Sequence, residues 1–283
     1  MKMDKNIFSM IFKLQKKQPW LSEKEHQLIH LLYEDCTSSA QRELLIELLD
    51  RFIYLENKEF NAALNHICDR LVADPTINSK NTQLVSLTTD SFSDSGQYIL
   101  YALKSRLEKR GWREHLLINR SGSSFKEFNR HDQKHTNIIF IDEYIGSGST
   151  VINQYNTLTK QYGEIKIKIK SISIAASSVG LYNLKEKNIE CFCVHEIKRG
   201  ISDYYPDRET IDKNLSLMDN LENILSQSYN KRMLPKNGYG NTESLYSRED
   251  GNTPNSVFPI FWWPFYRDEK NRDPLLFRAM RDA

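Results

Sequence analysis

The sequence predicts an α/β protein with a mainly parallel sheet, preceded by a helical N-terminal region and followed by an aromatic C-terminal extension. Short apolar or β-branched runs alternate with amphipathic stretches from residue 83 to residue 196. This alternation is typical of crossover connections, which join parallel strands. Of the 283 residues, 39% are hydrophobic and 27% are charged, so the composition is that of a folded protein and excludes disorder and collagen as its main character.

Three segments follow one another along the chain. Residues 1–78 carry apolar residues at helical spacing in three stretches, and Pro75 with the polar run 78–81 ends this helical region. Residues 79–232 form the predicted core. Residues 233–283 combine glycines and prolines with an aromatic run, so this extension must pack onto another part of the protein. The aromatic run consists of Phe258, Phe261, Trp262, Trp263, Phe265 and Tyr266.

The core elements are predicted from periodicity. Strands are expected where apolar and β-branched residues run together, and helices where apolar residues recur three or four positions apart. The predicted strands are residues 83–88, 115–118, 137–141, 168–175 and 189–196. The predicted helices are residues 97–110, 150–162, 181–187 and 209–234.

Charge and cysteine content indicate which binding partners and which cellular compartment to expect. The 39 basic and 37 acidic residues leave a net charge of +2, so the chain has no global attraction to nucleic acid or anionic membranes. Recognition of phosphate must therefore be local. Four cysteines are too few for a disulfide scaffold. Since the first residues also lack a small-residue cleavage site, we expect a cytoplasmic protein with no membrane partner.

One segment carries the chemistry. The predicted strand 137–141 is followed by Asp142 and Glu143, then by Tyr144 and Ile145, and then by a small-residue loop that opens a helix. The loop consists of Gly146, Ser147, Gly148, Ser149 and Thr150. Backbone N–H groups at a helix N-terminus, together with these hydroxyls, can surround a phosphate, and glycine allows close approach. The paired acids suit sugar hydroxyls or a hard cation such as Mg²⁺.

Two other interpretations of this segment stay open. Four apolar residues followed by Asp-Glu also fit the Walker B strand of an ATPase, but the required G-x-x-x-x-G-K-[ST] loop occurs nowhere in the chain. An ordinary strand end with Ser149 as a helix N-cap is the second alternative. It leaves the paired acids and the two glycines unexplained.

The run from residue 138 to residue 150 resembles the signature of the type I phosphoribosyltransferases. In that family, four apolar, two acidic and two apolar residues precede a Thr/Ser/Gly loop that binds the ribose 5-phosphate of phosphoribosyl pyrophosphate. The resemblance implies that Asp142 and Glu143 hold the ribose hydroxyls, whereas the five loop residues hold the 5′-phosphate. It also implies displacement at the anomeric carbon, with Mg²⁺ chelated by the pyrophosphate and the ribose hydroxyls. The alternative is a catalytically inactive binding or regulatory protein. The acceptor stays unknown.

Further contacts are predicted around this site. Ser93, Asp94, Ser95 and Gly96 follow the first predicted core strand, and they form either a pyrophosphate loop or a plain capped turn. Residues 119–136 are expected to be a loop, either one that closes over the site, as in the family, or a solvated one. Arg199 could meet pyrophosphate or be exposed.

The aromatic extension also has two interpretations. Trp262 could stack on a substrate, or the rings could form a hydrophobic cover or a subunit contact. The glycines and asparagines of the extension resemble those of a branch of phosphoribosyltransferase-like proteins in bacterial conflict systems, including retron-associated effectors. That resemblance implies an anti-phage defence complex with a protein or nucleic-acid partner.

Overall fold

The computed structural model describes residues 5–88 and 95–280 and divides into two compact units. The sheet unit is Lys58–Glu196, and the helical unit joins Met1–Asn57 to Ile197–Ala283. The N-terminal helices and the aromatic extension therefore share one unit, although they lie at opposite ends of the sequence. The last helix predicted in the N-terminal region, α4 (Asn57–Ala73), falls almost entirely within the sheet unit.

The sheet unit is built on five strands. They are β2 (Thr82–Ser86), β3 (Leu116–Ile118), β4 (Asn137–Ile145), β5 (Lys168–Ser177) and β6 (Glu190–Ile197). Their order in the sheet is β3-β2-β4-β5-β6, and the β2–β3, β2–β4 and β4–β5 pairs are parallel. The predicted α/β fold with a mainly parallel sheet is confirmed. The apolar run 138–141 is at most 1% exposed, because a central parallel strand is buried on both faces.

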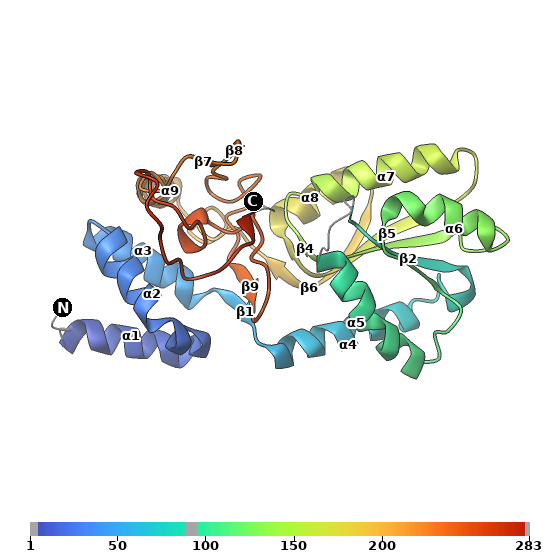
Figure 1. Cartoon of the computed structure of the whole chain (residues 1–283), viewed down its shortest axis with the longest axis horizontal. Helices are drawn as coiled ribbons and strands as arrows, with labels where there is room; N and C mark the ends of the chain where they lie inside the picture. Colours follow the sequence, from blue (N-terminus) through green and yellow to red (C-terminus); the bar gives the residue numbers. More distant parts are fainter. Residues whose placement is uncertain (1–4, 89–94, 281–283) are drawn as a thin grey trace. The chain divides into compact units, whose positions relative to one another are not determined.

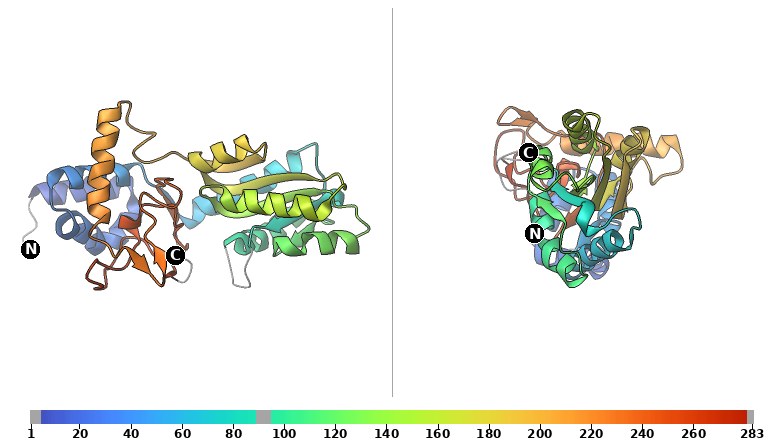
Figure 2. Two further views of the ribbon diagram at one scale, coloured as in Figure 1. Left: turned by 90° about the horizontal axis from the view of Figure 1, so that it is seen from above. Right: turned by 90° about the vertical axis from the view of Figure 1, so that its right-hand side faces the viewer.

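Helices cover both faces of this sheet (Figure 1). One face carries α4 and α5 (Ser95–Lys109), and the other carries α6 (Ser124–Arg130), α7 (Ser149–Tyr162) and α8 (Ser178–Glu186), which the view from above shows in front of the strands (Figure 2). Two 3-10 turns, η3 (Ser79–Asn81) and η4 (Ser121–Ser123), complete the unit. Among the described residues, no helix combines the length and the apolar character needed to cross a bilayer.

The strand order creates a switch point between β2 and β4. The chain leaves β2 for β3 on one side of the sheet, and it leaves β4 for β5 on the other side. The helices that follow these two strands, α5 and α7, also lie on opposite faces (Figure 1). In open α/β sheets, ligands bind outside the carboxyl ends of the strands at such a switch point. The fold therefore directs attention to the ends of β2 and β4.

The helical unit contains short helices around an aromatic core. Its helices are α1 (Lys5–Lys17), η1 (Pro19–Lys24), α2 (Glu25–His30), the π-helical turn η2 (Leu31–Asp35), α3 (Ser39–Asp50), α9 (Arg208–Glu222) and η5 (Pro259–Phe261). Its strands are β1 (Ile53–Leu55), β7 (Ser228–Tyr229), β8 (Arg232–Met233) and β9 (Tyr246–Arg248), and β1 pairs in parallel with β9. Leucines of α2 and α3 share a core cluster with Phe258, Phe261, Trp262 and Trp263.

The predicted helix 209–234 is wrong in its C-terminal half, because α9 ends at Glu222. The chain then turns into the β7–β8 hairpin, in which Asn230 and Lys231 have positive φ angles that no helix permits. Leu225 forms an isolated β-bridge with Tyr266 of the extension. Long-range pairing therefore overrides the apolar periodicity that predicted a longer helix.

A buried ion pair ties the extension to the N-terminal helices. The Arg272 guanidinium donates to Asp35 Oδ2 through Nη2 (2.6 Å) and Nε (2.9 Å), and both side chains are at most 2% exposed. Tyr266 donates its hydroxyl to the other oxygen of Asp35 at 2.8 Å. Because a buried carboxylate needs such partners, this network fixes the C-terminal segment against the end of η2.

Candidate functional site

Asp142 and Glu143 lie within β4 rather than after it. The strand continues past the predicted end at residue 141 to Ile145, since it keeps pairing with β5 at Asp142↔Ser173 and Tyr144↔Ala175. Successive side chains of a strand point to opposite faces, so the two carboxylates diverge. Glu143 is buried, with 3% of its surface exposed, whereas Asp142 is half-buried. Asp142 is therefore the more accessible acid of the pair.

Asp142 meets the start of α5. Its Oδ1 accepts hydrogen bonds from Ser95 Oγ at 3.1 Å and from the backbone N–H of Glu143 at 2.7 Å. Pairing between β2 and β4 stops at Ser86↔Ile141, so α5 begins beside the part of β4 that has lost this neighbour. The structure thus brings together Asp142, which sequence analysis placed at the end of the strand 137–141, and Ser95, which it placed in the loop after the first core strand.

Gly96 explains how α5 comes so close. A Cβ atom on Gly96 would lie 2.6 Å from Ser86 Oγ and 3.1 Å from the carbonyl oxygen of Ile141. Only glycine fits at this distance from the ends of both strands. Of the predicted pyrophosphate loop, Ser95 and Gly96 form the first turn of α5, whereas Ser93 and Asp94 lie outside the described residues.

The five-residue loop predicted to bind phosphate opens α7. Gly146, Ser147 and Gly148 connect β4 to the helix, and Gly148 has a left-handed φ of 78° that favours glycine. Ser149 and Thr150 form the exposed first turn, and Ser149 Oγ lies 3.0 Å from Ser147 Oγ. Hydroxyls and N–H groups therefore gather at the positive end of a helix, where an anion is favoured.

The back of this loop rests on α8, a feature that sequence analysis missed. Ser177 donates its hydroxyl to the carbonyl oxygen of Gly146 at 2.6 Å, and Asn183 donates its amide to the carbonyl oxygen of Ser147 at 3.0 Å. A Cβ atom on Gly180 would lie only 2.1 Å from the Gly146 oxygen. Ser177, just after the predicted strand 168–175, could have indicated this contact. The carboxyl ends of parallel strands lie at one edge of the sheet, so residues at these ends are close to one another.

The predicted loop 119–136 is wrong for residues 121–130, because these residues fold into η4 and α6. Buried Ser124 donates to Gln83 Oε1 at 2.9 Å and lies 3.0 Å from the Tyr162 hydroxyl. Burial raises the pKa of Tyr162, so this hydroxyl stays protonated. The rings of Phe125 and Phe128 pack on Tyr162 at centroid distances of 5.0 and 5.1 Å. These contacts with β2 and α7 stabilise a helix in a segment with many polar residues.

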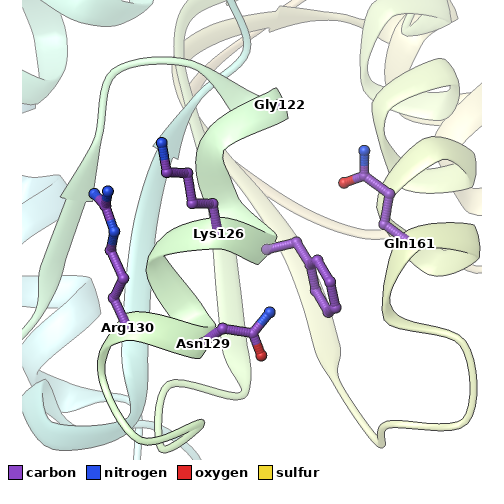
Figure 3. Close-up of a pocket in the computed structure, with 6 residues that line it drawn as sticks. Gly122, Lys126, Asn129, Arg130 and Gln161 are labelled. Atoms are coloured by element: carbon purple, nitrogen blue, oxygen red, sulfur yellow. The ribbon is translucent and has the colours of Figure 1, made fainter.

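A groove of about 650 Å³ lies between α6 and α7. Figure 3 shows Gln161 across the groove from Asn129, while Lys126 and Arg130 project along the side of α6 away from α7. Gln161 lies in the last turn of α7, which has 14 residues, so about 20 Å of helix separates it from the small-residue loop at the start of α7. The groove is therefore distinct from the loop at the start of α7.

Arg199 and Trp262 belong to the helical unit. The Arg199 guanidinium donates to Asp203 Oδ1 through Nε at 2.9 Å and Nη2 at 2.7 Å. Trp262 is 1% exposed, and its Nε1 donates to the carbonyl oxygen of Val257 at 2.9 Å. The indole ring packs edge-on against Trp263, so the structure places Trp262 in the hydrophobic core.

The acidic residues that the structure describes do not form a complete protein site for a metal ion. Within residues 5–88 and 95–280, no three His, Cys, Asp or Glu side chains converge in a way that could hold one. A hard cation prefers six or more oxygen ligands. At Asp142, such a cation would need to take most of its oxygens from a bound phosphate or sugar.

Solved structures similar to this chain include two proteins of low sequence identity. The orotate phosphoribosyltransferase of Aeropyrum pernix is similar at 11% identity and a TM-score of 0.31, over 56% of this chain and 75% of that one. The AQ2163 protein of Aquifex aeolicus is similar at 11% identity and a TM-score of 0.33, over 62% of this chain and 84% of that one. No curated protein matches. The model of one protein family, PRTase-CE, matches residues 34–278, and the chain therefore belongs to this phosphoribosyltransferase-like family.

Proposed function

We propose that this protein binds phosphoribosyl pyrophosphate, or a related ribose 5-phosphate, at the carboxyl ends of β2 and β4. The observation that carries the proposal is the loop from Gly146 to Thr150, which opens α7 at the switch point of the sheet beside Asp142. An anion is favoured at this helix N-terminus. The carboxylate of Asp142, which can accept hydrogen bonds from sugar hydroxyls, lies a few residues away in the sequence.

Each part of the ligand has a partner in this proposal. The 5′-phosphate binds the hydroxyls and N–H groups of the loop, and a ribose hydroxyl donates to Asp142. The ribose contact falls chiefly to Asp142, because Glu143 is only 3% exposed. The pyrophosphate faces Ser95 and Gly96, since the first turn of α5 presents a second positive helix end.

The proposed reaction is displacement at the anomeric carbon. A nucleophilic atom of the acceptor, or water, forms a bond to this carbon, the carbon–oxygen bond to pyrophosphate breaks, and pyrophosphate leaves with the electron pair. The acceptor loses a proton to solvent. Bound Mg²⁺ would neutralise the leaving pyrophosphate, while the protein contributes positioning and charge stabilisation.

Calorimetric titration with phosphoribosyl pyrophosphate and Mg²⁺ tests the donor site. Asp142→Asn removes the charge of the carboxylate that is proposed to accept the ribose hydroxyl. A hydrogen bond to a charged group contributes about 1.5 to 3 kcal/mol, so we expect affinity to fall about 10- to 100-fold. The matched control is Asp132→Asn, since Asp132 is exposed and pairs with Lys134. Unchanged affinity in a folded Asp142→Asn variant would sink the assignment.

An assay of pyrophosphate release distinguishes an active transferase from a protein that only binds the ligand. Specific binding without release, in the presence of candidate acceptors, would support the catalytically inactive alternative. The resemblance to retron-associated effectors further predicts a macromolecular partner. Release that begins only when a co-expressed protein or nucleic acid is added would support that defence role. Release by the isolated chain at full rate would oppose it.

A further inference from the structure

We propose that Ser177, Gly180 and Asn183 of α8 and its N-cap are positioning residues for the phosphate loop. Ser177 and Asn183 donate hydrogen bonds to the loop backbone, Gly180 packs closely against it, and the carbonyl groups of Gly146 and Ser147 therefore face α8. The N–H groups of the same turn then point outward, where the phosphate binds. This inference rests on the proposed function, and it assigns a role to residues outside the signature that predicted the site.

The hydrogen bonds account for the carbonyl groups of the turn. Gly146 accepts from Ser177, Ser147 accepts from Asn183, and Gly148 accepts from the N–H of Ile152 at 3.0 Å inside α7. A carbonyl oxygen carries partial negative charge and would repel a phosphate. Because all three carbonyls of the turn have donors on the protein side, none needs to face the anion.

Two glycines allow the backbone of the loop to pack directly against the backbone of α8. A Cβ atom on Gly148 would lie 3.2 Å from the carbonyl oxygen of Gly180, and a Cβ atom on Gly180 would lie 2.1 Å from that of Gly146. At this separation the side chains of Ser177 and Asn183 reach the loop directly. Close packing leaves the loop little freedom to rearrange, so less entropy is lost when a ligand binds.

Asn183 is the residue best suited to a test. Its side chain is half-buried, and its amide bonds the loop, whereas Ser177 also accepts from the N–H of Gly180 and so caps α8. Asn183→Leu removes the donor and keeps a side chain of similar size with a high helix propensity. Asn156→Leu is the matched control, because Asn156 is an exposed asparagine in the middle of α7.

The experiment compares two ligands. Ribose 5-phosphate probes the loop, and pyrophosphate with Mg²⁺ probes the start of α5. Loss of one neutral hydrogen bond corresponds to about a twofold to tenfold change, so we expect Asn183→Leu to weaken ribose 5-phosphate binding by a factor in this range and to leave pyrophosphate binding unchanged. Amide hydrogen exchange at residues 147–150 should be faster in this variant, while β4 stays protected.

Each outcome decides between the proposals. Equal binding of ribose 5-phosphate by the wild type and the folded Asn183→Leu variant would overturn the positioning role alone. If the variant binds both ligands more weakly by the same factor, the substitution causes a general structural defect, and the positioning role is also overturned. If the wild type binds neither ligand, the proposed function fails, and the inference fails with it. Should the leucine variant not fold, Asn183→Ala allows the same comparison.

Discussion

Replacing Gly180 by alanine should displace the loop 146–150, which we propose to bind phosphate. The new Cβ atom would lie 2.1 Å from the carbonyl oxygen of Gly146, whereas ordinary contacts of such atoms begin near 3.4 Å. The loop or α8 must therefore move by more than about 1 Å. Overpacking of this kind costs about 1 to 3 kcal/mol, and the higher helix propensity of alanine returns about 1 kcal/mol. We expect the free energy of unfolding to fall by at most about 2 kcal/mol.

Gly180→Ala should also weaken ligand binding. A displacement of about 1 Å can cost a positioned site about 100-fold, so affinity for phosphoribosyl pyrophosphate should fall by one to two orders of magnitude. Urea unfolding and calorimetric titration measure the two quantities. Gly122→Ala is the control, because no atom lies within 4 Å of its added Cβ.

A specific result would refute this reasoning. If Gly180→Ala gains about 1 kcal/mol of stability and binds the ligand as tightly as the wild type, then α8 does not contact the loop as described. Amide exchange at residues 146–150 provides a second check, since a displaced loop should exchange faster even without ligand.

Two further predictions concern buried charges in the helical unit. Arg272→Leu leaves Asp35 buried without its cation and should lower the free energy of unfolding in urea by about 3 to 5 kcal/mol, while a double variant with Asp35→Leu should recover most of this loss. Equal stability of the single and double variants would contradict this. Burial, offset in part by the N–H of Asn237 and by Lys236, raises the pKa of Glu222 from 4.5 to about 8. The folded state therefore favours the protonated acid, and stability should fall as pH rises from about 4.5 to about 8, by about 1.4 kcal/mol for each pH unit at most. Glu222→Gln should remove this slope in urea titrations, and parallel pH profiles would show that Glu222 titrates normally.

The strand, loop and helix around Asp142 could be predicted because they are continuous in sequence. Helix α7 begins at residue 149, one residue before the predicted start, and its first turn carries the predicted hydroxyls. The direction of Glu143 could not be predicted, since it depends on how far β4 continues beside β5. The contact between Ser95 and Asp142 joins residues 47 positions apart, which no local pattern indicates.

The segment 119–136 shows where local patterns mislead. Its serines, glycine and charged residues are typical of a loop, yet Ser124 and Phe128 are at most 1% exposed. Their burial depends on Gln83 and Tyr162, which come from β2 and α7. Tertiary contacts therefore decide the conformation of a short segment whose own preference is weak.

The sequence by itself determined the class of fold, the small-residue loop that opens α7 and the need of the aromatic extension to pack, because periodicity and turn chemistry are local properties of the chain. Only the tertiary structure decided that the extension shares a core with the N-terminal helices, that Asp142 meets the start of α5, and that α8 supports the loop. Each of these depends on burial and hydrogen bonding between residues that are distant in sequence. Such contacts form only in the folded chain, where buried polar groups find hydrogen-bond partners on other elements.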